Sequence, residues 1–182
     1  MKHWVAWLRG INVGAAGKGR KSVPMAELRQ LAEALGWKES QTYIQSGNLI
    51  FAASGTASSL QTELEKAIRD HFSFDVPVVV CALADMEKAL AACPYADEAE
   101  ERPNLVHIGF TTSKLGKDVV AELEPYCKNG ERVAVQGKFL WSDCPNGVGR
   151  SKLTPAVLDR AVGASVTMRN VKTLRAVVAM QP

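Results

Sequence analysis

The stretch KHWVAWLRGIN at residues 2–12 begins with a run of Trp, Val, Ala and Leu and is broken by glycine. Such a run predicts a buried strand over residues 2–9. The glycine-rich loop that follows extends to Lys21. A helix is expected next, with Pro24 in its first turn and Gly36 as its C-cap. The chain therefore starts as strand, long loop and helix.

Two short β-rich runs and a second helix complete the first half. Residues 42–45 and 49–53 are separated by Ser-Gly-Asn, which predicts a hairpin. The second helix is expected to start at Ser58, with Gln61 as its capping-box partner, and residues 77–81 predict another strand. The order βαββαβ is that of the split-βαβ, or ferredoxin-like, arrangement.

The second half repeats this order without visible similarity in sequence. The expected elements are a strand at 104–111, a helix at 117–127, a hairpin turning at Gly137, a helix from Thr154 to Gly163, a strand at 165–168 and a last helix capped by Asn170. We therefore predict an α+β protein of two ferredoxin-like halves in tandem, residues 1–82 and 104–182. A connecting helix and an acidic loop at 83–103 join them, and an extra helix ends the chain.

Charge is distributed unevenly along the 182 residues, although the formal net charge is only +3. Residues 1–22 carry five basic side chains and no acid, and residues 150–182 carry six bases and one acid. The stretch between them has a net charge of −7. Two basic ends that meet in space would attract phosphate or another anion, whereas two separate basic ends would only be solvated faces.

Several function classes are disfavoured by composition and motifs. The apolar content of 47% excludes a disordered chain, and neither a P-loop nor a Rossmann fingerprint is present. Residues 3–8 are too short to span a membrane. The cysteines (Cys81, Cys93, Cys127, Cys144) lack paired spacing, and the histidines (His3, His71, His107) are isolated. We therefore expect a cytoplasmic protein with reduced thiols, no metal, no cofactor and no membrane partner.

Two sets of polar and cationic residues are expected to gather where strands end. In a βαββαβ unit the end of the first strand shares one sheet edge with the hairpin before the third strand, and the first helix opens there with free N–H groups. The residues at this edge are Arg9, Asn12, Lys18, Lys21, Ser46 and Asn48. The corresponding loops of the second half hold Arg150, Ser151, Lys152, Arg169 and Asn170.

Five short motifs resemble those of the bacterial domain-of-unknown-function family 1697: LRGINVG at 8–14, VPMAEL at 23–28, TYIQSGN at 42–48, GVGRSKLT at 147–154 and TMRN at 167–170. The resemblance spans nearly the whole chain and implies a cytosolic α+β fold of two ferredoxin-like halves. It implies no activity, cofactor or partner. The chain departs from the family pattern at Ala15, where a second glycine is usual, and at Val171, where tryptophan is common.

These observations favour a module that binds a phosphate-bearing ligand, either a nucleotide or a nucleic acid. One alternative is an enzyme acting on a small anionic substrate, with Arg9 and Lys152 stabilising charge and no identified general base. Cys144 beside His107 would supply a nucleophile for it. Another alternative is a protein-interaction module without catalysis. The glycines and Asn48 would then only shape turns.

Overall fold

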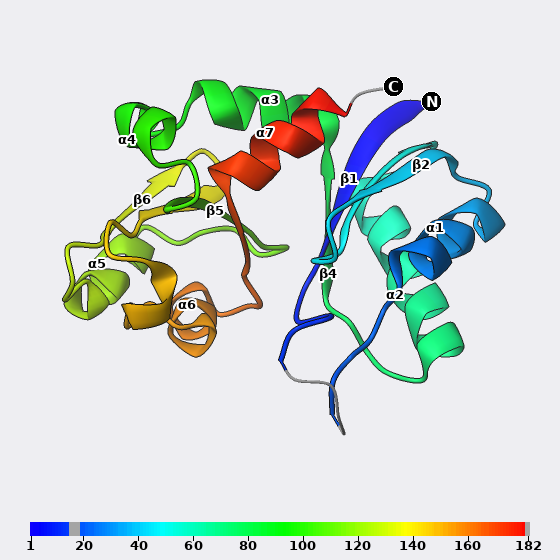
Figure 1. The fold of residues 1–182 in the computed structure, drawn as a ribbon, viewed down its shortest axis with the longest axis horizontal. Coiled ribbons are helices and arrows are strands. Elements are labelled where there is room, and N and C mark those ends of the chain that lie inside the picture. Colours follow the sequence, from blue (N-terminus) through cyan, green and yellow to red (C-terminus); the bar gives the residue numbers. More distant parts are fainter. Residues whose placement is uncertain (15–18, 181–182) are drawn as a thin grey trace. The chain divides into compact units, whose positions relative to one another are not determined.

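The computed structural model describes residues 1–14 and 19–180, so Lys18 of the expected site lies outside the described residues. The chain divides into two compact units (Figure 1). Unit 1 is Met1–Glu87 together with Ala176–Pro182, and unit 2 is Lys88–Arg175.

Unit 1 is a four-stranded antiparallel sheet with two helices. Its elements in chain order are β1 (Lys2–Leu8), α1 (Met25–Ala34), β2 (Lys38–Tyr43), β3 (Asn48–Ala53), α2 (Ala57–Phe72) and β4 (Val78–Ala82). The strand order is β2-β3-β1-β4, so β1 lies at the centre between β3 and β4. In the register of β1, Trp7 lies opposite Asn48 of β3 and Val79 of β4.

Unit 2 repeats this topology. Its sheet has the order β6-β7-β5-β8 and is also antiparallel. After α3 (Leu83–Ala91), the elements are α4 (Ala96–Glu101), β5 (Val106–Phe110), α5 (Val119–Leu123), β6 (Arg132–Gln136), β7 (Phe139–Asp143), α6 (Pro155–Val162), β8 (Thr167–Asn170) and α7 (Val171–Ala179). Both α3 and α7 have residues in both units. The predicted α+β fold of two ferredoxin-like halves with an extra C-terminal helix is confirmed.

The core of unit 1 lies between the sheet and the helices α1 and α2. Trp4, Ala6 and Leu8 alternate along β1 and pack with Leu28 of α1 and Leu64 of α2. The residues between them on β1 are buried as well, so both faces of this strand are covered. This explains why β1 is a continuous apolar run and does not alternate with polar residues.

Unit 2 has its own core on the helix-covered side of its sheet. Leu123 of α5, Leu140 of β7 and Leu158 of α6 are buried together. Thr154 caps α6 through a bond from the Val157 N–H, and Gly163 ends the helix with a left-handed φ of 72°. Both helix ends were predicted from these residue types.

Four local predictions were wrong in detail. The cap of α2 is Thr56, which forms a capping box with Ser59 in place of the expected Ser58–Gln61 pair. β2 begins at Lys38, four residues before the β-rich run. The helix expected at 117–127 does not reach its predicted end. Residues Glu124–Tyr126 form a 3₁₀ turn instead, because a proline lies within this turn. The acidic stretch 97–101 is the helix α4, since Ala99 is buried and acids suit a first turn.

No helix within residues 1–14 and 19–180 has both the length and the apolar character needed to cross a membrane.

The different burial of two leucines on the helices predicts that replacing each with alanine lowers the free energy of unfolding by a different amount. Leu64 is fully buried, so Leu64→Ala is expected to lower the free energy of unfolding by about 2–5 kcal/mol. Leu31 is only partly buried and packs at the margin of the core, so Leu31→Ala should cost less. Urea denaturation of the two variants measures both values. Equal losses would mean that the register of α1 is wrong.

Candidate functional site

The end of β1, the β2–β3 turn and the segment before β4 meet at one edge of the unit 1 sheet. The Leu8 N–H donates to the Gly47 carbonyl at 2.9 Å, and the Arg9 N–H donates to the Pro77 carbonyl at 3.0 Å. A Cβ added at Gly47 would lie 2.7 Å from Leu8 Cβ, so only glycine permits this approach. We call this region the β1 edge and define it as residues 8–12, 19–23, 44–47 and 75–77. Its location is the one that the topology predicts.

Asn12 fixes the loops of the β1 edge. Its side-chain amide donates to the Val23 and Gln45 carbonyls, each at 2.8 Å, and its Oδ1 accepts from the Val23 N–H at 2.9 Å. The Asn12 N–H also donates to the Lys21 carbonyl at 2.9 Å. Its φ of 55° lies in the left-handed region, which asparagine tolerates well. These bonds use both the donor and the acceptor of the Asn12 carboxamide. Asn12 therefore positions the loops of the β1 edge, and its side chain is not the group that would contact a ligand.

Asn48 and Ser46 likewise serve the hairpin. Asn48 is fully buried, and its side-chain amide donates to the Tyr43 carbonyl and to Ser46 Oγ, each at 3.0 Å. These bonds close the turn between β2 and β3. The structure therefore brings Arg9, Asn12, Ser46 and Asn48 to one edge, as predicted, but it gives the two asparagines internal partners.

Two cations of the β1 edge, Arg20 and Lys21, bond to neutral acceptors. Lys21 Nζ donates to the main-chain carbonyl of Asp75 at 2.5 Å, and Arg20 Nη2 lies 3.4 Å from the Asn12 carbonyl. A carbonyl oxygen satisfies a donor without cancelling its charge. The Asp75 carboxylate is instead paired with Arg69. Arg20 and Lys21 thus remain a source of positive potential at this edge.

The N-terminus of α1 adjoins these cations through the same asparagine. Its N-cap is Pro24, whose side chain makes no capping bond, and Val23 is the residue held by Asn12. The first-turn acid, Glu27, interacts with His71 Nε2 at 2.7 Å. The first turn therefore offers N–H groups and the positive end of the helix dipole beside Arg20 and Lys21.

The structure places some of the predicted residues in the loops of the second half on the surface and others in the interior. Arg150 and Lys152 are exposed, and within the described part of the chain neither forms an ion pair. Ser151 Oγ accepts from the Leu153 N–H, and Asn170 Oδ1 caps α7 by accepting from the Thr173 N–H at 2.8 Å. Burial lowers the pKa of Arg169 to about 10, and its Nη1 donates to the Met168 carbonyl. Arg169 and Asn170 lie opposite the start of β5, and Ser151, Arg169 and Asn170 have internal hydrogen-bond partners.

A buried ion cluster in unit 2 was not found from the sequence. Asp143 is 1% exposed, and its carboxylate accepts from Arg102 and Arg132, each at 2.8 Å. Burial by itself would raise the pKa of Asp143, but the bonds from the two guanidinium groups lower it. Arg132 also pairs with Glu98 of α4. The cluster ties α4 to the sheet, and its parts are too far apart in sequence for a local pattern to show it.

The proposed Cys144–His107 nucleophile is not supported by the geometry. Burial raises the pKa of the Cys144 thiol to about 11, whereas a nucleophilic cysteine has a lowered pKa. Burial also lowers the pKa of His107, whose Nδ1 lies 3.1 Å from the Leu105 carbonyl. The same carbonyl accepts from the Cys144 N–H at 2.9 Å. Cys144 and His107 are therefore packed residues of the sheet.

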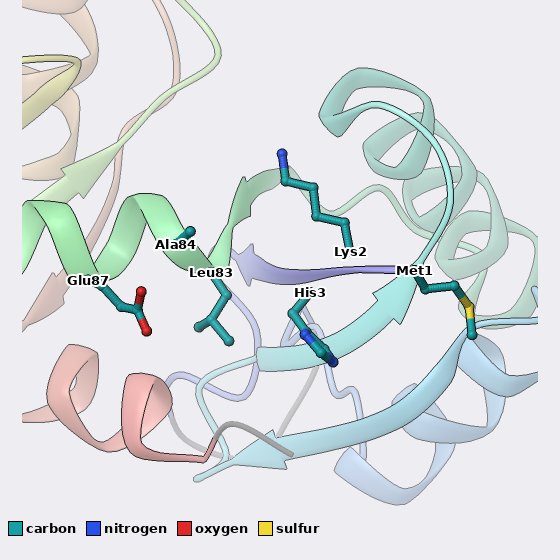
Figure 2. A pocket seen from close by; sticks show the side chains of 6 residues that line it. All are labelled: Met1, Lys2, His3, Leu83, Ala84 and Glu87. Atoms are coloured by element: carbon teal, nitrogen blue, oxygen red, sulfur yellow. The ribbon is translucent and has the colours of Figure 1, made fainter.

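A small cavity of about 280 Å³ lies at the opposite end of β1 from the β1 edge. Figure 2 shows its lining, in which Lys2 and His3 at the start of β1 stand near Leu83, Ala84 and Glu87 of α3. His3 interacts with Glu39 of β2 at 2.9 Å, and Lys2 lies over the Trp4 ring at 4.5 Å. None of the predicted ligand residues lines this cavity.

Comparisons with known proteins agree with the fold. The model of the family described as "Protein of unknown function (DUF1697)" matches residues 1–141. The chain is also similar to the solved structure of the conserved bacterial protein SP0830 from Streptococcus pneumoniae, with 26% identity, a TM-score of 0.74 and 98% of each chain covered. A search of curated proteins gave no significant match.

Asn12 gives a prediction for the stability of unit 1. Asn12→Asp keeps an acceptor for the Val23 N–H but sets a negative oxygen against two carbonyl oxygens, so we expect a loss of roughly 2–4 kcal/mol in unfolding free energy. Asn146 makes one exposed bond, to the Asn129 carbonyl, so Asn146→Asp should cost less than about 1 kcal/mol. Denaturant unfolding compares the two. Equal stability of Asn12→Asp and the parent would contradict the positioning role.

Asp143 gives a prediction with a pH dependence. At pH 7, Asp143→Asn should lose roughly 2–4 kcal/mol because two guanidinium groups lose their carboxylate. The lowered pKa of Asp143 means that its contribution is present above the unfolded value, about 3.9, and is lost as the pH falls below it. The difference between variant and parent should therefore shrink below about pH 4. Asp70→Asn, which breaks the exposed Lys66–Asp70 pair, is the control, with an expected cost of about 0–1 kcal/mol.

Proposed function

The chain belongs to the family described as protein of unknown function (DUF1697), and because that description assigns no activity, we propose a function from the geometry of the β1 edge: the protein binds a phosphate-bearing ligand there, either a nucleotide or a nucleic acid. The observation that carries the proposal is the environment of Arg20 and Lys21. Both side chains bond main-chain carbonyls, and among residues 1–14 and 19–180 neither pairs with a carboxylate. Their charge is therefore available to a phosphate group.

The first turn of α1 supports the same ligand class. Its N–H groups lack a capping side chain at Pro24, and Asn12 holds the preceding residue in place. Backbone N–H groups at a helix N-terminus bind phosphate oxygens, and a nearby lysine or arginine adds charge. The nearby acids, Glu27 and Asp75, are engaged by His71 and Arg69. They therefore oppose an incoming anion less than free carboxylates would.

The other predicted residues take different parts in this proposal. Arg9 leaves β1 at the edge and contributes a third cation to it, while Asn12, Ser46 and Asn48 position the loops. Arg150 and Lys152 form a further cationic surface on unit 2 that suits phosphate groups. We place this binding in the cytoplasm because Cys81, Cys93, Cys127 and Cys144 are free thiols.

Binding is favoured over catalysis at this edge. A reaction at phosphate needs a base or a nucleophile within hydrogen-bond reach of the reacting atom. The carboxylate of Asp75 is paired with Arg69, and Cys144, in the other unit, has a raised pKa. Ligand binding without chemistry is therefore the function that the edge residues support best.

Thermal unfolding with inorganic pyrophosphate and with a short oligonucleotide tests the proposal. The parent is expected to be stabilised, by about 2.7 kcal/mol at 100 times the dissociation constant. A variant carrying Arg20→Gln and Lys21→Gln should lose most of this ligand-induced shift. A steep weakening of oligonucleotide binding between low and moderate salt would indicate several phosphate contacts.

The control for this experiment changes the same net charge elsewhere. Lys114→Gln with Lys117→Gln removes two exposed cations of unit 2 and should leave the shift at its parental size. An unchanged shift in the Arg20/Lys21 variant, or no shift in the parent with either probe, would overturn the proposal.

A further inference from the structure

Two aliphatic side chains are exposed at the β1 edge or directly beside it. Val13 is 64% exposed and Ile44 is 51% exposed, and the other large apolar side chains of the described residues with this much exposure are Met1 and Val148. Single exposed apolar residues are common on protein surfaces. The two at this edge differ from that background because Val13 lies in the loop that also holds Arg20 and Lys21, and Ile44 lies in the turn that Asn12 joins to this loop.

Ile44 is held in an unfavourable backbone conformation. Its φ is 48°, in the left-handed region, where a β-branched residue is a rare outlier. Asparagine or glycine would suit this turn position without strain. Neither turn geometry nor core packing therefore requires isoleucine here. Strain of this kind is concentrated at binding sites.

Hydrogen bonds from the side chain and the backbone of Asn12 connect the neighbours of the two aliphatic residues with Lys21. Asn12, the neighbour of Val13, donates to the carbonyl of Gln45, the neighbour of Ile44, at 2.8 Å. The Asn12 N–H donates to the Lys21 carbonyl at 2.9 Å. Asn12 therefore brings the residues next to Val13 and Ile44 together with the main chain of Lys21.

We propose that the ligand of the β1 edge is a nucleotide whose base packs on Val13 and Ile44 while its phosphate groups meet Arg20 and Lys21. This rests on the proposed function and narrows it, because an inorganic phosphate or a sugar phosphate has no apolar face for the aliphatic pair. A base presents such a face together with the phosphate charge. A ligand with both features uses the two kinds of surface that the edge displays.

Titration calorimetry with AMP and with ribose 5-phosphate tests the proposal. The parent is expected to bind AMP about tenfold more tightly or better, since burying one aliphatic side chain supplies that much. Ile44→Asn and Val13→Ser should each remove most of this preference and leave the affinity for ribose 5-phosphate unchanged. Ile44→Asn should also unfold at the same temperature as the parent or higher, because asparagine suits the left-handed φ.

Ser73→Asn is the matched control for the backbone effect. Ser73 is exposed and also has a left-handed φ, 61°, at the C-cap of α2, so this variant gains the same backbone relief without altering the edge. It should bind both probes like the parent. Equal affinity of the parent for AMP and ribose 5-phosphate, with no effect of either edge variant, overturns this inference and leaves phosphate binding intact. Binding of neither probe also overturns this inference, whereas the measurement with pyrophosphate and the oligonucleotide decides phosphate binding itself.

Discussion

The β1 edge depends on the hydrogen bonds that the side-chain carboxamide of Asn12 makes. Three bonds from one side chain join the loop after β1 to Val23, before α1, and to Gln45, in the β2–β3 turn. Without them, the loop carrying Arg20 and Lys21 would lose its attachment to the hairpin. Ordering such loops in advance removes a conformational cost that a ligand would otherwise have to meet.

The amide side chains and the cationic side chains at this edge form different kinds of hydrogen bond. Amide side chains can donate and accept, and here they satisfy main-chain groups that the turns leave open. Cationic side chains can only donate, and the carbonyls that they meet do not neutralise them. The asparagines therefore hold the loops of the edge together, and Arg20 and Lys21 supply its positive charge. The polar character that these residues share does not show which of them hold the loops and which supply charge.

The sequence predicted the topology better than it predicted the roles of individual residues. The order of β1, α1 and the hairpin follows from local apolar runs and turns, and from it the meeting of Arg9 with Ser46 and Asn48 follows by geometry. The partners of Asn12 and Asp143 depend on segments far apart in sequence.

Comparing the halves shows how one topology is stabilised in two ways. In unit 2, Arg102 and Arg132 converge on Asp143, and Arg175 pairs with Glu100 of α4, so these three basic side chains are paired with carboxylates. In unit 1 the strand ends are joined by the neutral amides of Asn12 and Asn48 instead. At the unit 1 edge, Arg20 and Lys21 bond to main-chain carbonyls, whereas Arg102 and Arg132 of unit 2 share the carboxylate of Asp143. Each half thus joins its strand ends with a different kind of polar interaction, neutral amides in unit 1 and an ion cluster in unit 2.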